Sequence, residues 1–80
     1  MTKGELARIV ASAHGVDSAT ALKVINGFLG LIVTTTASGV PVQLHGFGTF
    51  TLDEARAPIR GRLSRSPTFR PSKAYRQQVR

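Results

Sequence analysis

Basic side chains are the residues of this chain whose types and spacing could do chemistry, and they gather in its last third. Of the 80 residues, 11 are Lys or Arg and 4 are Asp or Glu, which gives a formal net charge of +7. Charges cancel over residues 1–53, so the whole excess lies in residues 54–80. The cations there are mostly arginines, whose planar guanidinium suits phosphates and base edges. Charge alone therefore favours nucleic acid as the partner, ahead of an anionic membrane surface or a basic tail that only improves solubility.

The other polar residues give little support for catalysis or metal binding. Ser12, His14 and Asp17 are the residue types of a catalytic triad, but no nucleophile motif or oxyanion-hole pattern accompanies them. The four carboxylates show no pairing typical of acid–base catalysis. His14 and His45 lack an acidic cluster, and the chain has no cysteine. We therefore expect neither an enzyme nor a bound metal, cofactor or small-molecule substrate.

Two helices are expected in the first half of the chain. Thr2 and Glu5 have the spacing of a capping box, and the apolar residues that follow predict a helix over about residues 3–13. Ser18 is the expected cap of a second helix, which should end near Gly39. The second helix carries a stripe wide enough to pack on more than one neighbour, formed by Leu22, Ile25, Leu29 and Ile32 with further apolar residues beside them.

The apolar period changes after the second helix. Alternating residues and a Gly-Phe-Gly turn predict a β-hairpin over about residues 40–53. Residues 53–67 are rich in Arg, with Pro and Gly, and are expected to form a loop or an exposed extension. A third strand is expected at residues 68–70, and Ser72 should cap a final helix over about residues 73–79. The expected fold is a single α+β domain with a helical hairpin, a three-stranded antiparallel sheet and a short terminal helix.

No stretch of the sequence resembles a signal peptide or a membrane span. The longest unbroken run of apolar residues and glycine, Gly27–Val33, is far shorter than the ~20 residues that a spanning helix needs. The sequence opens directly into a helix pattern without a cleavable apolar region. We expect a cytoplasmic protein with no membrane partner.

Four segments together resemble a known family, and they lie at Thr2–Leu6, Val42–Phe50, Gly61-Arg62 and Thr68–Ser72. That family is the bacterial HU/IHF group of histone-like, DNA-bending nucleoid proteins. The Gly-Phe-Gly-Thr-Phe stretch is its most specific piece, whereas Thr-Phe-Arg-Pro is closer to the integration host factor branch. The resemblance implies an intertwined homodimer on double-stranded DNA in the nucleoid. Residues 1–39 would form its helical base, residues 40–71 its sheet and arm, and residues 72–80 its terminal helix.

The resemblance and the charge pattern together imply roles for individual residues. The apolar residues expected in the dimer core are Leu22, Ile25, Phe28, Leu29, Ile32, Leu44, Phe47, Phe50 and Phe69. The residues expected to contact DNA are Lys3, Gly46, Gly48, Arg56, Arg60, Arg62, Arg65, Arg70, Lys73 and Arg76. Arg62 is the strongest single candidate, because it lies in the matching Gly-Arg pair.

Most of the family's DNA-embracing arm has no counterpart in this sequence. In the family, the Gly-Arg pair precedes an Asn-Pro tip and a returning strand, whereas here Gly61-Arg62 is followed after a few residues by Phe69. The proline that wedges between base pairs therefore has no match by motif, and Pro58 and Pro67 fit ordinary turns better. We expect largely sequence-non-specific binding with less bending than full-armed relatives produce.

Two other functions stay open on the sequence. A chain with a dimer core and a short arm could pair with a full-length relative in a heterodimer and modulate its DNA binding. A small RNA-binding protein would also fit the basic tail, although few aromatic residues are available to stack on bases.

Overall fold

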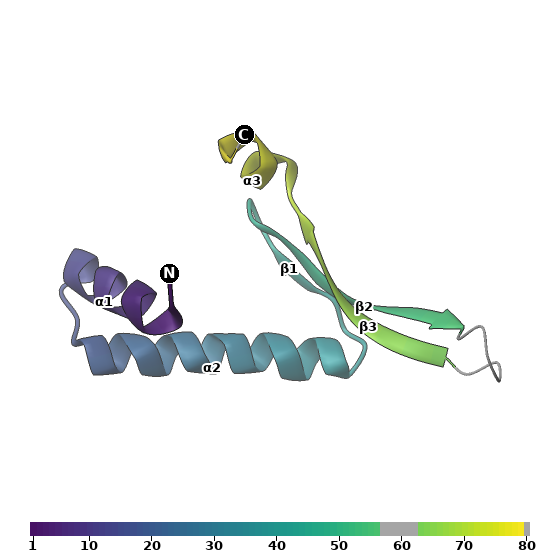
Figure 1. Cartoon of the computed structure of the whole chain (residues 1–80), viewed down its shortest axis with the longest axis horizontal. Coiled ribbons are helices and arrows are strands. Elements are labelled where there is room, and N and C mark those ends of the chain that lie inside the picture. The colour runs from purple at the N-terminus through teal and green to yellow at the C-terminus, as the bar shows by residue number, and fades with distance from the viewer. Residues whose placement is uncertain (57–62, 80) are drawn as a thin grey trace. The chain divides into compact units, whose positions relative to one another are not determined.

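The computed structural model has the predicted order of elements, helix-helix-strand-strand-strand-helix (Figure 1). It describes residues 1–56 and 63–79. For residues 54–56, 63 and 64 it describes the backbone only. The elements are α1 (Lys3–His14), α2 (Ser18–Ala37), β1 (Val42–Leu44), β2 (Gly48–Arg56), β3 (Leu63–Pro71) and α3 (Lys73–Gln78). The expected α+β class is confirmed. The chain divides into two compact units, residues 1–31 and 32–80, and this division falls within α2.

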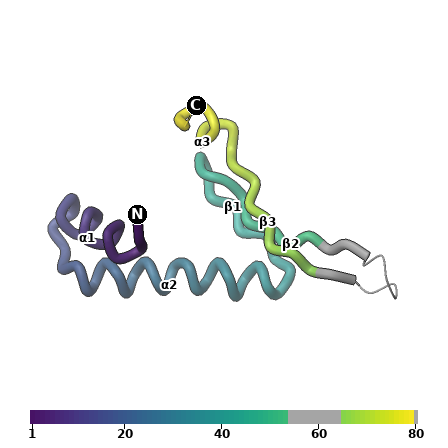
Figure 2. The backbone as a smooth tube through the Cα atoms, viewed as in Figure 1, coloured from purple at the N-terminus to yellow at the C-terminus, as the bar shows by residue number. Residues whose placement is uncertain are grey.

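Small residues hold the first unit together, where α1 packs on the first part of α2 (Figure 2). The Thr2 hydroxyl accepts a hydrogen bond from the Glu5 amide at 3.2 Å, which confirms the predicted cap of α1. The buried cluster consists of three alanines, Ala7, Ala11 and Ala21, with Leu22 and Ile25 packed against it. Alanines let two helices approach closely, but they remove little apolar surface from water. A single copy of this unit is therefore weakly stabilised.

The start of α2 differs by one residue from the prediction. The Asp17 carboxylate accepts a hydrogen bond from the Thr20 amide at 3.3 Å, so Asp17 caps the helix and the expected cap Ser18 is its first residue. Both residue types are good caps, and a carboxylate is also favoured by the helix dipole. At the other end, the Thr36 hydroxyl donates to the Ile32 carbonyl at 2.7 Å. That bond gives the hydroxyl a partner inside the helix, which continues to Ala37.

The length and composition of α2 bear on the expectation that no segment spans a membrane. Among the described helices, α2 alone is long and apolar enough to cross a bilayer, with a mean hydropathy of 1.3. This helix contains no long unbroken apolar run, because α2 mixes apolar residues with threonines and alanines and carries one charged residue, Lys23. Length and composition are weak evidence for a span, since the core helix of a soluble protein meets the same criteria.

The three strands form one antiparallel sheet in the order β1-β2-β3. The β2–β3 pairing runs from Gly48 opposite Pro71 to Arg56 opposite Leu63. Of the two alternatives expected for residues 53–67, a loop or an exposed extension, the loop is wrong for residues 53–56 and 63–67, which are paired strands. Their polar composition hides the period of two on which the prediction depended. Pro67, which was expected in a turn, instead lies within β3 opposite Leu52. A proline is tolerated there because β3 is an edge strand of this sheet.

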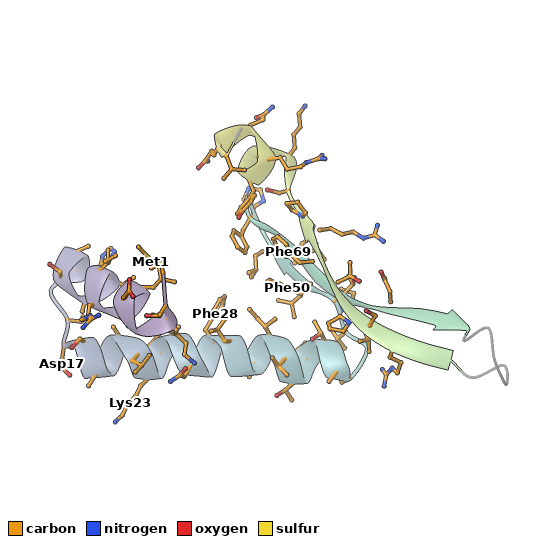
Figure 3. The ribbon with its side chains drawn as sticks, in the orientation of Figure 1. Met1, Asp17, Lys23, Phe28, Phe50 and Phe69 are labelled. Carbon is orange, nitrogen blue, oxygen red and sulfur yellow. The ribbon has the colours of Figure 1, made fainter. Side chains whose placement is uncertain are left out.

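Aromatic residues cover one face of the sheet. Phe50 and Phe69 are directly opposite each other in the register, and their ring centroids lie 4.7 Å apart (Figure 3). Val42 lies opposite Phe50 on the other side, so the three residues form an apolar row across the sheet. We call this side of the sheet the aromatic face.

Candidate nucleic-acid interface

The opposite side of the sheet is polar and carries one of the predicted cations. Thr49 lies opposite Gln43 in β1 and opposite Arg70 in β3, so the three residues form one row across the sheet. Successive residues of a strand alternate between faces, which puts this row on the side away from Phe50 and Phe69. We call this side the polar face. Its amide, hydroxyl and guanidinium groups can all donate hydrogen bonds to phosphate oxygens.

A basic hollow of about 620 Å³ opens where the β1–β2 turn meets the start of α3. The residues that line it include His45, Gly46, Gly48, Thr49, Arg70 and Lys73. Four of these, Gly46, Gly48, Arg70 and Lys73, were predicted to contact DNA, and the structure brings them together around one space. Sequence reasoning did not include His45 and Thr49 among the candidate site residues. The alternation of the strands on either side of the Gly-Phe-Gly turn is the signal that could have found Thr49.

Backbone and aromatic contacts fix the two walls of the basic hollow to each other. The Ser72 amide donates to the Phe47 carbonyl oxygen at 2.9 Å, which ties the start of α3 to the turn. The Phe47 ring meets Tyr75 edge-on, with centroids 5.0 Å apart, and contacts Phe69 at 5.3 Å. The Ser72 hydroxyl also accepts from the Tyr75 amide at 3.0 Å, which confirms the predicted cap of α3. These contacts fix the positions of the backbone segments that bear the cations of the basic hollow.

The fold requires glycine at both Gly46 and Gly48, for a different structural reason at each position. Gly46 has φ 77°, a left-handed conformation that L side chains rarely adopt. Gly48 is buried, and a Cβ built on it would lie 2.5 Å from Cε1 of Phe69. Both glycines are therefore required by the fold itself, whatever the backbone of the turn contacts.

Arg65 lies on the other face from Arg70. It is five residues before Arg70 in β3, and an odd spacing in a regular strand changes the face. Its Nη2 atom donates to the carbonyl oxygen of Ala37, the last residue of α2, at 3.3 Å. A cation at that position satisfies an end carbonyl and complements the helix dipole. Arg65 thus has a structural role that the sequence did not predict.

Two other predicted cations with described side chains, Lys3 and Arg76, are not among the residues that line the basic hollow. Lys3 is the first residue of α1, in the other compact unit, and its side chain is exposed. Arg76 is exposed on α3, and Arg56 ends β2 opposite Leu63. Arg60 and Arg62 lie outside the described residues, so the strongest single candidate of the sequence stays a prediction.

The residues expected in the dimer core leave much apolar surface uncovered. Phe28 is 50% exposed and Leu29 43% exposed, whereas Ile32 is buried. Leu22, Ile25, Leu44, Phe50 and Phe69 are half-buried, and Phe47 is 41% exposed. No large side chain in the described part of the chain is fully buried. Such exposure on a long helix is typical of a surface that another chain covers.

Comparisons with known proteins agree with this geometry. The family model described as "Bacterial DNA-binding protein" matches residues 1–80. The chain is similar to the DNA-binding protein HU of Geobacillus stearothermophilus, with 33% identity over an alignment of 91 positions that covers all of both chains. It is also similar to the HU of Thermotoga maritima, with 31% identity over 90 residues and the same full coverage.

Solved structures show the same similarity in three dimensions. The Anabaena HU–DNA cocrystal structure matches with a TM-score of 0.82 and 32% identity, covering 99% of this chain and 97% of that one. The Thermotoga maritima HU structure matches with a TM-score of 0.79 and 29% identity over the full length of both chains. With a family model that spans every residue and relatives that match from end to end, the chain belongs to the HU/IHF family of bacterial DNA-binding proteins.

Proposed function

We propose that this protein is an architectural, largely sequence-non-specific double-stranded DNA-binding protein that acts as a dimer. The family match over residues 1–80 is the observation that carries this function. The relatives are DNA-binding proteins, and one neighbouring structure is a complex with DNA. The function is therefore binding and not catalysis.

The polar face and the basic hollow supply a surface suited to the DNA backbone. Arg70 and Lys73 are exposed beside the same space, and none of the described residues that line it is acidic. Cations that replace condensed counterions on phosphates give affinity that depends on salt and little on sequence. Thr49 and Gln43 add neutral hydrogen-bonding groups in the same row, which suits phosphate contact better than base readout.

A second copy of the chain is the partner that the exposed apolar residues require. The buried hydrophobic residues of the described chain are three alanines and Ile32, which is too little for a stable monomer of this size. A dimer would cover Phe28 and Leu29 and double the number of cations presented to one duplex. We infer a homodimer. The alternative is a heterodimer with a full-armed relative, which co-expression of the two chains followed by native mass spectrometry would detect.

Alanine substitutions in the basic hollow test the proposed surface. We expect Arg70→Ala and Lys73→Ala each to weaken binding to unrelated duplexes by similar factors. Each should reduce the salt slope by about 1.8 in a dimer, which is about 0.9 for each lost phosphate contact. Lys23→Ala is the matched control, because Lys23 is exposed on α2 and lies outside the hollow. Equal losses in the control and the test variants would contradict the proposed surface.

From the same function we infer that the protein lies in the bacterial cytoplasm, on the nucleoid. The family match supports this location. A fluorescent fusion of the full chain should follow the DNA stain in dividing cells, and the double variant Arg70→Ala/Lys73→Ala should spread through the cytoplasm. A wild-type fusion that ignores the DNA would contradict this localisation.

A further inference from the structure

Among the described residues that line the basic hollow, His45 is the one titratable residue that the proposed function has not used. It lies in the β1–β2 turn between Leu44 and Gly46, its side chain is exposed, and it lines the same space as Arg70 and Lys73. These three residues come from three different elements, namely the turn, β3 and α3. The contact between Ser72 and Phe47 holds those elements together, so the three basic groups converge in a braced site.

We propose that His45 is a third phosphate-binding residue of the basic hollow, one that contacts the DNA backbone as an imidazolium and makes DNA affinity depend on pH. The inference rests on the proposed function, because the phosphate it binds belongs to the duplex. An imidazole is the side chain that gains or loses its charge between about pH 5 and 8. Guanidinium and ammonium groups ordinarily keep their charges throughout that range.

A phosphate bound in the basic hollow should stabilise the protonated form of His45. Within the described lining of the hollow, the charged neighbours are Arg70 from β3 and Lys73 from α3, and none of the lining residues is Asp or Glu. A phosphate that enters the hollow favours the protonated form of the imidazole, because an anion beside an imidazole stabilises its positive charge. DNA binding should therefore take up protons.

The sign of the pH effect follows from this linkage. If the DNA complex binds more protons than the free protein, lowering the pH favours the complex. Affinity should then rise as the pH falls from about 8 to about 6, the range over which a histidine gains its charge. The salt slope should rise with it, by up to about 0.9 for each imidazolium that contacts a phosphate.

The test measures binding of a linear duplex across a salt series at pH 6 and pH 8, by fluorescence anisotropy, for the wild type, His45→Gln and His14→Gln. The chain has two histidines, and His14 ends α1 in the other compact unit, which makes His14→Gln a matched control. We expect the wild type and His14→Gln to bind about 2- to 20-fold more tightly at pH 6, from one exposed imidazolium in each of two subunits. His45→Gln should lose most of that difference.

A second variant keeps the test decisive if His45→Gln folds poorly. His45→Arg carries a fixed charge, so it should bind at both pH values with the salt slope that the wild type shows at pH 6. A wild type that binds equally well at both pH values, or a His45→Gln that keeps the full pH dependence, would overturn the role of His45 and leave the proposed function intact. A wild type that binds no duplex at any pH would overturn both.

Discussion

Gly48 lies against the ring of Phe69, so closely that a Cβ on Gly48 would come within 2.5 Å of Cε1 and 2.7 Å of the Arg70 carbonyl oxygen. The two residues belong to neighbouring strands, and Gly48 pairs with Pro71 in the register. The missing side chain thus lets Phe69 fill the space between the turn and α3, where it also contacts Phe47. Because Gly48 has no side chain, Phe69 of the aromatic face can pack against Phe47 in the turn that lines the basic hollow.

Replacing Gly48 by alanine should destabilise the protein. The clash involves a backbone oxygen as well as a ring, so we expect a loss of about 1–3 kcal/mol in the free energy of unfolding, as for other overpacked sites. Urea unfolding at one fixed protein concentration measures it. Gly4→Ala is the control, because a Cβ there meets only the Thr2 hydroxyl at 3.9 Å. Equal stability of Gly48→Ala and the wild type would show that the strands can separate without cost.

Arg65 and Arg70 should separate stability from DNA binding. Arg65→Ala removes the hydrogen bond to the Ala37 carbonyl, and we expect it to lower the free energy of unfolding by about 0.5–1.5 kcal/mol. Arg70→Ala should leave the free energy of unfolding nearly unchanged and weaken DNA binding more than Arg65→Ala does. Urea unfolding and anisotropy titrations on the same two preparations provide both measurements. The reverse pattern would show that Arg65 is the DNA contact and that its bond to α2 is dispensable.

A charge on the exposed apolar surface of α2 should break the dimer. Phe28→Glu would place an unpaired carboxylate in the proposed interface, at a cost of about 3–5 kcal/mol for a buried, unpaired charge. Sedimentation velocity should then show monomeric or unfolded chain at concentrations where the wild type is a dimer. Asn26→Glu is the control, with the same change of charge on an exposed position of the same helix. A dimeric Phe28→Glu would place the subunit interface elsewhere.

Local signals in the sequence predict the helices and the first hairpin well. The Thr2 and Ser72 caps and the Gly46 turn each depend on a few neighbouring residues, and the structure confirms both caps. The extent of β2 and β3 could not be predicted in the same way, because Asp53–Arg56 and Leu63–Pro67 pair across the arm and lack an apolar period. Their strand structure comes from the pairing between them, which is not a local property.

The candidate site shows the same division between local and long-range information. The charge asymmetry indicates the last third of the chain, but it does not show which cations share a surface. Pairing of β2 with β3 puts Arg70 on the polar face and Arg65 on the other face. The basic hollow depends further on the backbone hydrogen bond between Ser72 and Phe47, which are 25 residues apart in the sequence. His45 joins the site only once that contact is known.

The most direct test of DNA binding by the polar face is the salt dependence of wild-type affinity for two linear duplexes of unrelated sequence. Titrations between about 50 and 200 mM salt should give similar affinities for both duplexes. The logarithm of the association constant should fall with the logarithm of salt concentration, with a slope of at least about 3.6 in magnitude, from Arg70 and Lys73 of two subunits at about 0.9 each. Absence of binding at the lowest salt, or an affinity that salt does not change, would contradict it.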